Sequence, residues 1–195
     1  MRSFFTIVTL ALFCSCAAVN TDKTESPKSP PDLYYDLREP IYLVIDESFW
    51  SGCEKDVVCR ASRLRQINGG IDEWMDYFED SSRPQVLIFS SKDELPVEGV
   101  NKIIHVQLQP EICGKTALAC WFAHTKPPKI VFAHQQWTTP CIMAHEFGHV
   151  LGRDDNDVPE GVKSVMSYAT QKMVEPLDFK MMCKLHAECK GMKHK

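Results

Sequence analysis

Short runs of apolar or alternating residues recur along the chain and predict β-strands. Clusters of Pro, Gly, Asp or Lys flank each run, as is common where strands end. The predicted strands are Ile41–Ile45, Val86–Ser90, Ile103–Leu108, Trp121–His124 and Ile130–Ala133. We expect these strands to form one sheet.

Apolar residues spaced three and four positions apart predict helices at two places. The first pattern covers residues 57–78, where the pair Gly69-Gly70 is a candidate interruption. The second covers residues 176–190 and carries one apolar stripe, the pattern of a helix that packs one face on a core. The residues of this stripe are Leu177, Met181, Leu185 and Cys189.

Residues that start and stop helices predict a further helix from Pro140 to about Leu151. Thr138-Thr139 offers hydroxyl caps directly before the proline, and proline favours the first helical position. Gly152 ends the helix, because glycine tolerates the left-handed conformation that follows a last turn. The order of strand, helix, strands, helix and final helix predicts an α+β fold class.

The first residues of the chain are typical of a signal peptide. Met1-Arg2-Ser3 is a charged start, and the apolar run that follows, residues 4–13, is too short to span a bilayer. A hydrophobic first strand or helix is the alternative. Residues 17–39 are polar and rich in proline, which predicts a flexible tether. We therefore expect a signal peptide at 1–16, a tether at 17–39 and one domain at 40–195.

The end of the apolar run, Leu12-Phe13-Cys14-Ser15-Cys16-Ala17, resembles a bacterial lipobox. The resemblance implies a lipoprotein whose lipid anchor is Cys16, held at a bacterial cell envelope. Phe13 stands where an aliphatic residue is usual, and plain cleavage near Ala17 followed by secretion is the alternative. With Ala17 rather than an acidic residue after the cysteine, we expect the outer membrane if the cell has one.

Composition and cysteine usage narrow the class of protein. The formal net charge is −4 and no basic stripe is present, so nucleic acid is not an expected partner. The many cysteines beyond Cys16 suit an oxidising compartment, and no CxxC pair points to a zinc site. Neighbouring cysteines suggest the disulfides Cys53–Cys59, Cys113–Cys120 and Cys183–Cys189, with Cys141 left over. Spacing alone does not settle the connectivity.

The helix predicted from Pro140 to about Leu151 contains the motif HExxH, formed by His145, Glu146 and His149. Side chains four residues apart lie on one face of a helix, so both imidazoles can bind one metal ion, while Glu146 lies beside it and can act on water. Two surface histidines on a helix are the plainer alternative. Asp155 lies three residues after Gly152 and is the candidate third ligand. Glu175 is the competing third ligand, as in thermolysin-like enzymes, and otherwise an N-cap neighbour.

Beyond Asp155 comes the stretch Ser164-Val165-Met166-Ser167-Tyr168, and here the sequence resembles the metzincin clan of zinc peptidases. The resemblance implies that Met166 forms the Met-turn. Most metzincins have a third histidine where this chain has Asp155, and the snapalysin-like members have aspartate. Tyr168 is similar to the tyrosine that astacins and serralysins place near zinc, where it assists catalysis; a buried aromatic is the alternative.

The same resemblance implies a mixed five-stranded sheet over an active-site helix, with a smaller C-terminal subdomain that holds the Met-turn and a final helix. It also implies a monomeric zinc-dependent endopeptidase that cleaves extended protein or peptide substrates bound along the strand at 121–124. An exported zinc-binding or inactive metallopeptidase-like module that binds a protein partner is the alternative. The remaining histidines have no paired spacing, and we expect them at the surface or in the cleft. They are His105, His124, His134, His186 and His194.

Overall fold

The fold is taken from a computed structural model that describes residues 35–96, 103–110, 113, 117–155, 158, 162–167, 173–192 and 194. The signal-peptide and lipid-anchor predictions, including Cys16, lie outside these residues, and so does Tyr168. Within the described part of the chain, no helix has the length and hydrophobicity that a membrane span requires.

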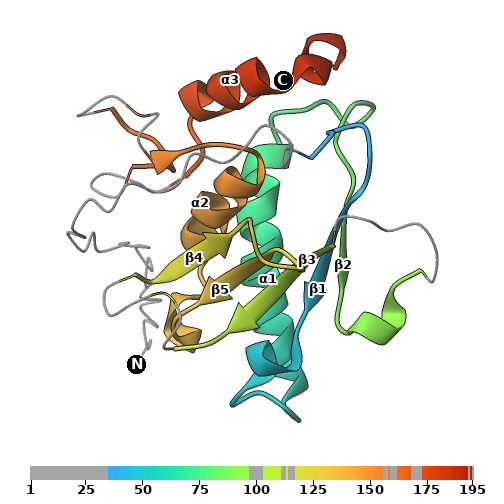
Figure 1. Cartoon of the computed structure of the whole chain (residues 1–195), viewed down its shortest axis with the longest axis vertical. Helices are drawn as coiled ribbons and strands as arrows, with labels where there is room; N and C mark the ends of the chain where they lie inside the picture. Colours follow the sequence, from blue (N-terminus) through green and yellow to red (C-terminus); the bar gives the residue numbers. More distant parts are fainter. Residues whose placement is uncertain are drawn as a thin grey trace, which may run out of the picture.

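A mixed five-stranded sheet forms the centre of the α+β fold, with the order β2-β1-β3-β5-β4 (Figure 1). Strands β1, β2, β3 and β5 are parallel, and β4 pairs with β5 in the antiparallel direction at one edge. The strands are β1 (Ile41–Ile45), β2 (Val86–Phe89), β3 (Ile103–Leu108), β4 (Ala119–Phe122) and β5 (Lys129–Phe132). The five predicted strands are confirmed, although β4 begins two residues earlier than the sequence predicted.

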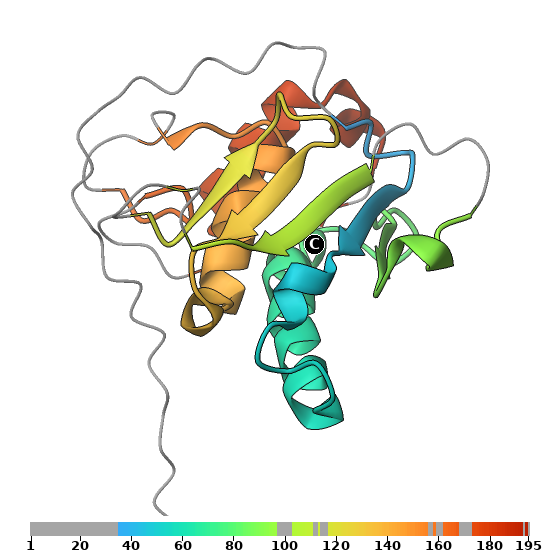
Figure 2. The ribbon, with the colours of Figure 1, turned by 60° about the horizontal axis from the view of Figure 1, so that its bottom comes forward.

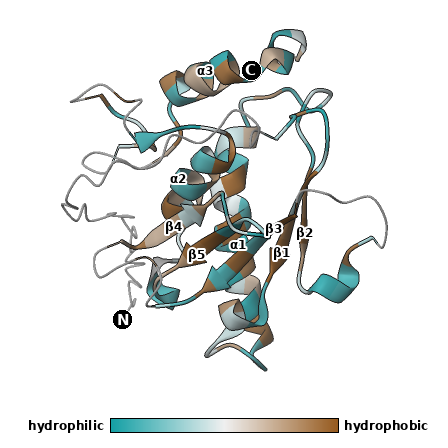
Figure 3. Cartoon of the chain, in the orientation of Figure 1, coloured by the Kyte–Doolittle hydropathy of each residue, from teal (hydrophilic) through white to brown (hydrophobic). Residues whose placement is uncertain are grey.

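Two helices, α1 (Val57–Met75) and α2 (Pro140–Val150), lie side by side on one face of the sheet (Figures 1 and 2). Alternate residues of β1 point into the core that the helices share with the sheet. These residues are Ile41, Leu43 and Ile45. Figure 3 shows the corresponding hydrophobic strands in the middle of the sheet. Burial of this apolar surface, at about 25 cal/mol per Å², is the main force that holds α2 in place.

The two helices approach each other closely at Gly70, and α1 continues through it without a break. The predicted interruption at Gly69-Gly70 is therefore wrong. A Cβ atom on Gly70 would lie 2.5 Å from the Met143 Cβ atom and 2.5 Å from the carbonyl oxygen of Pro140. One turn further along α1, the indole N–H of Trp74 donates to the carbonyl oxygen of Ala144, at 2.7 Å. The absence of a side chain at Gly70 therefore allows α1 and α2 to cross at close range, and this contact fixes α2 beside α1.

The last helix differs from its prediction in length and in its buried face. Helix α3 (Pro176–Leu185) ends where His186 leaves the helical conformation, and the short 3-10 helix η6 (Ala187–Gly191) follows. The predicted stripe does not form the buried face, since Leu177 and Leu185 are 36% and 40% exposed. The residues that α3 buries are Asp178, Phe179 and Met182. A buried aspartate breaks the apolar pattern, so the pattern pointed to the wrong face.

The folded domain begins earlier than residue 40. Tyr35 and Leu37 are buried in the core, although the sequence placed them in the tether. The backbone N–H of Leu37 donates to the Glu188 carboxylate at 3.0 Å. These contacts order a segment whose polar neighbours made it resemble a linker.

All three predicted disulfides are confirmed, and Cys141 is buried and forms none. Cys53–Cys59 lies at the start of α1, Cys113–Cys120 joins a loop to β4, and Cys183–Cys189 joins α3 to η6. Each bridge closes a short local loop, and Cys53 and Cys189 are buried.

Two adjacent glycines test the helix crossing. We expect Gly70→Ala to lower the free energy of unfolding by about 1–3 kcal/mol, because its Cβ atom would overlap α2. Gly69→Ala is the control, since its Cβ atom would lie 3.5 Å from Pro140, and the helix propensity of alanine should stabilise it by up to about 1 kcal/mol. Urea unfolding measures both values, and equal effects at the two positions would contradict the crossing.

Candidate metal centre

Helix α2 carries the HExxH motif, and local interactions fix both of its ends. The Thr139 hydroxyl accepts from the backbone N–H of Ile142 at 3.4 Å, with Pro140 in the first turn. At the other end, Gly152 has a φ of +82°, a left-handed conformation that glycine adopts without strain. The N–H of Gly152 donates to the His149 carbonyl, and that of Arg153 donates to the Gly148 carbonyl, both at 2.9 Å. This Schellman motif turns the chain sharply after α2.

The turn brings Asp155 back to the two histidines of α2. The Nε2 atoms of His145 and His149 lie 3.3 Å and 3.4 Å from Asp155 Oδ1. Ligand atoms of all three residues lie within 4.8 Å of one another, and no other described group of three or more His, Cys, Asp or Glu residues does so. The three predicted metal ligands are therefore gathered at one point. Glu175 is the N-cap of α3 and does not belong to this cluster.

Backbone carbonyl groups set the orientation of both imidazoles. His145 Nδ1 lies 2.9 Å from the Val165 carbonyl oxygen, and His149 Nδ1 lies 2.8 Å from that of Arg153. A carbonyl oxygen only accepts, so each Nδ1 carries the hydrogen and each Nε2 carries a lone pair in the neutral ring. Both Nε2 lone pairs then face the Asp155 carboxylate, an arrangement that a cation among the three atoms would stabilise.

The distances between the donor atoms fit a zinc ion. Two donor atoms that each lie about 2.0–2.1 Å from one ion, at a tetrahedral angle of about 109°, are about 3.3 Å apart. The observed separations from Asp155 Oδ1 are 3.3 Å and 3.4 Å. Two imidazoles and one carboxylate are also a donor set that catalytic zinc sites use, and hydrogen bonds from the far ring nitrogens to backbone oxygens are typical of such ligands.

Glu146 is buried beside the ligands and is not one of them. The backbone N–H of Trp121 in β4 donates to its carboxylate, whose Oε2 atom is buried without a hydrogen-bond partner among the described residues. Burial raises the pKa of Glu146 to about 7 and the Asp155 charge adds to the rise, whereas His145 and the Trp121 N–H oppose it. A carboxyl group with this environment can both accept and release a proton near neutral pH.

Met166 packs against the ligand helix from the turn that also orients His145. It is fully buried, and a Cβ atom on Gly148 would lie 2.4 Å from its sulfur and 2.8 Å from the Trp74 ring. Gly148 lies between the two histidines of the motif, so a side chain there would separate α2 from both neighbours. Met166 therefore lies next to the HExxH helix, and its role as the Met-turn beneath a metal stays a prediction.

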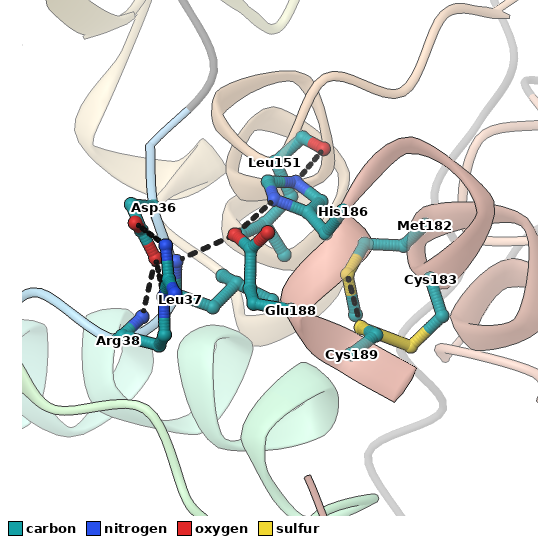
Figure 4. Close-up of polar contacts among 9 residues, drawn as sticks. All are labelled: Asp36, Leu37, Arg38, Leu151, Met182, Cys183, His186, Glu188 and Cys189. Carbon is teal, nitrogen blue, oxygen red and sulfur yellow. Dashed lines mark hydrogen bonds and ion pairs between the residues drawn. A yellow bond between two sulfur atoms is a disulfide. The ribbon is translucent and has the colours of Figure 1, made fainter. Parts of the chain in front are cut away.

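The C-terminal end of α2 is also held by the segment after α3 (Figure 4). His186 is buried, and its Nε2 atom lies 3.0 Å from the Leu151 carbonyl oxygen. Its Nδ1 atom lies 3.1 Å from Glu188 Oε1, the oxygen that also accepts from Leu37. The His186 ring therefore bridges the end of α2 and the Glu188 carboxylate. The N-terminal segment is thus connected to the end of α2, and the expectation that His186 lies at the surface or in the cleft is wrong.

His105 corrects the same expectation, since it is buried and its Nδ1 atom lies 2.7 Å from Asp46 Oδ1. Sequence reasoning also missed three contributors to the site, namely Val165, Arg153 and Trp121. Each acts through a backbone group, and a backbone group carries no residue-type signal at its position.

Comparison with models of protein families and with curated proteins finds no match to this chain. The evidence for function therefore comes from the residues of the site.

The link through Glu188 predicts a dependence of stability on pH. Burial opposes ionisation, yet the N–H groups of Leu37 and Glu188 and the His186 ring together lower the pKa of Glu188 below its ordinary value of 4.5. A lowered pKa stabilises the fold above the unfolded-state pKa, and this contribution disappears as the pH falls through the folded-state pKa.

We therefore expect Glu188→Gln to lower the free energy of unfolding by about 1 kcal/mol at neutral pH. The difference from wild type should shrink as the pH falls below 4.5 and through the lowered pKa of Glu188, below which both side chains are neutral. Glu94→Gln is the control, because the exposed Glu94 also accepts a backbone N–H, from Ser90 at 2.8 Å, and contacts no histidine. Chemical unfolding at several pH values measures both variants. A Glu188→Gln difference that does not change with pH would contradict this account.

Proposed function

We propose that the chain is a zinc-dependent endopeptidase of metzincin type. The observation that carries the proposal is the orientation of the two imidazoles, whose Nδ1 atoms are tied to backbone carbonyls while their Nε2 atoms face Asp155. His145, His149 and Asp155 would hold the ion. The order of HExxH, glycine turn, aspartate and buried methionine resembles the metzincin pattern and supports the same assignment.

Bound zinc supplies Lewis-acid polarisation of a carbonyl group and of water. Glu146 would handle the proton, because its carboxylate is adjacent to the ligands but is held by the Trp121 N–H rather than directed at Asp155. In peptide hydrolysis it accepts a proton from the attacking water and delivers it to the leaving amine. The burial of Glu146 also limits access of bulk water to this proton.

The substrate would be an extended polypeptide bound along β4. Among the residues that the structure describes, this strand pairs with β5 alone, and its Trp121 N–H reaches Glu146, so its other edge borders the site. An added peptide strand uses backbone hydrogen bonds, which do not depend on substrate sequence. We therefore expect a protein or peptide substrate and a monomeric enzyme.

Export to a bacterial cell envelope completes the proposal. The three disulfides indicate folding in an oxidising compartment. The lipobox-like end of the apolar N-terminal run supports acylation of Cys16. Tyr35 is already buried in the core, so fewer than twenty residues would separate the folded domain from the anchor.

A binding module that holds zinc without cleaving its partner is the second candidate. The same three ligands would serve it, but it would not need a buried carboxyl group beside them. A third candidate is a cluster without metal, in which hydrogen bonds between the two histidines and Asp155 take the place of the ion. Zinc content and cleavage, measured together, separate these cases.

Three substitutions test the assignment of roles. Glu146→Ala should keep zinc and lose about 10²–10⁴-fold in peptidase rate, because the residue handles a proton and not the metal. Asp155→Ala should lose both, since two histidines leave the ion under-coordinated. Glu175→Ala should retain both. Elemental analysis for zinc beside a casein-cleavage assay, with and without a chelator, gives the two readouts.

Two outcomes would overturn these assignments. Loss of zinc in Glu175→Ala, with full zinc in Asp155→Ala, would make Glu175 the third ligand and favour a thermolysin-like enzyme. Zinc binding in wild type without cleavage of any polypeptide substrate would favour the binding module.

The lipid anchor has a separate test. Cys16→Ala should shift the protein from the membrane fraction to the soluble fraction, because removal of the acylated residue removes the buried chains, at about 0.8 kcal/mol per methylene group. Cys14→Ala is the matched control and should stay in the membrane fraction. Detergent-phase partitioning measures both, and equal partitioning of wild type and Cys16→Ala would contradict the anchor.

A further inference from the structure

Asp178 is a buried carboxylate on α3 that the proposed reaction does not use. Its exposed fraction is 0%, and it lies in the first turn of the helix. Burial of a charged group is costly unless donors surround it, so the partners of Asp178 indicate its purpose. Two of them orient the histidines of the candidate metal centre.

The first of these residues is Val165, in the turn that precedes Met166. The Val165 N–H donates to Asp178 Oδ2 at 2.9 Å, and its carbonyl oxygen accepts from His145 Nδ1 at 2.9 Å. Ser164, one residue earlier, donates its hydroxyl hydrogen to Asp178 Oδ1. The carboxylate therefore fixes the two residues that place the hydrogen-bond acceptor of His145.

The second is Arg153, in the turn after α2. Its carbonyl oxygen accepts from His149 Nδ1 at 2.8 Å. Its guanidinium group is fully buried, donates to the Asp178 carbonyl oxygen at 3.0 Å and lies 4.0 Å from Asp178 Oδ1. Arg153 also lies two residues before Asp155, so the position of its backbone influences where the Asp155 carboxylate lies.

We propose that Asp178 is a positioning residue for the metal centre, which holds both imidazoles in their ligating orientation through Val165 and Arg153. The inference rests on the proposed function, because it concerns the same three ligands. Asp178 contacts both residues whose carbonyls receive the Nδ1 hydrogens. Its carboxylate accepts from the Val165 N–H and lies 4.0 Å from the Arg153 guanidinium group, which donates to the Asp178 backbone carbonyl. Without the Asp178 carboxylate, Val165 and Arg153 can move. The carbonyl oxygens that hold the imidazoles then move with them, and no hydrogen bond within α2 opposes rotation of the rings.

A role limited to capping α3 makes different predictions. Asp178 Oδ2 also accepts from the Glu175 N–H at 3.0 Å, as a capping residue would. Capping alone would affect the stability of α3 and leave the metal centre unchanged. The test therefore compares ligand orientation and metal affinity at matched loss of stability.

The main variant is Asp178→Asn in the full chain, which keeps the shape of the side chain and removes its charge and one acceptor. Phe179→Leu is the matched control, because Phe179 belongs to the same helix and packs on Tyr77, Phe78 and His194, none of which is a proposed metal ligand. Ser164→Ala is a milder second variant that keeps the Asp178 charge beside Arg153.

The readouts are the zinc dissociation constant from chelator competition, the visible spectrum of the cobalt-substituted protein, and the imidazole nitrogen resonances of the metal-free protein. We expect Asp178→Asn to bind zinc about 10–100-fold more weakly, as is typical when an outer hydrogen-bond partner of a metal ligand is lost. Its cobalt bands should shift, and His145 and His149 should lose the single Nδ1-protonated form. Ser164→Ala should change the same readouts to a smaller extent, and Phe179→Leu should change only the melting temperature.

Unchanged zinc affinity, cobalt spectrum and nitrogen resonances in Asp178→Asn would overturn the inference and leave the proposed function intact. If Asp178→Asn does not fold, unchanged readouts in Ser164→Ala would overturn it equally. Absence of zinc and cobalt binding in wild type would overturn the proposed function and this inference together.

Discussion

Two hydrogen bonds, from His145 Nδ1 to the Val165 carbonyl and from His149 Nδ1 to the Arg153 carbonyl, are the interactions on which the centre depends. They leave the Nε2 lone pairs directed at Asp155, and the helical spacing of the motif could not do this alone. Each acceptor lies outside α2, in a turn that the rest of the fold must hold in place. The Schellman turn at Gly152 presents one, and the turn before Met166 presents the other.

The packing of the domain serves the same arrangement from the opposite side of α2. Gly70 allows α1 to approach α2 closely, and Trp74 donates to the Ala144 carbonyl just before His145. Gly148 leaves room for Met166 and Trp74 together. Small residues in α2 and α1 thus let large side chains enclose the ligand helix, and close packing of this kind resists rotation of the helix as well as its separation.

Much of this fold could be predicted from local patterns. The strands were found because apolar runs end at turn residues, and α2 was found because Thr139, Pro140 and Gly152 mark its ends. The buried face of α3 was not found, because Asp178 is buried by hydrogen bonds and a charged partner rather than by hydrophobicity. The burial of Tyr35 and Leu37 was also missed, because this segment is held by a hydrogen bond to Glu188, which lies far along the chain. At the site, the three candidate ligands have a spacing in the sequence that can be recognised, whereas the backbone groups that orient them have no such spacing.

The central claim is that one zinc ion binds to His145, His149 and Asp155. Anomalous diffraction at the zinc absorption edge, from crystals of the protein grown with zinc, tests it most directly. The account predicts one strong peak at about 2.0–2.2 Å from both Nε2 atoms and from a carboxylate oxygen of Asp155. A zinc peak bound to Glu175 instead of Asp155, or no peak within bonding distance of the two histidines, would contradict it.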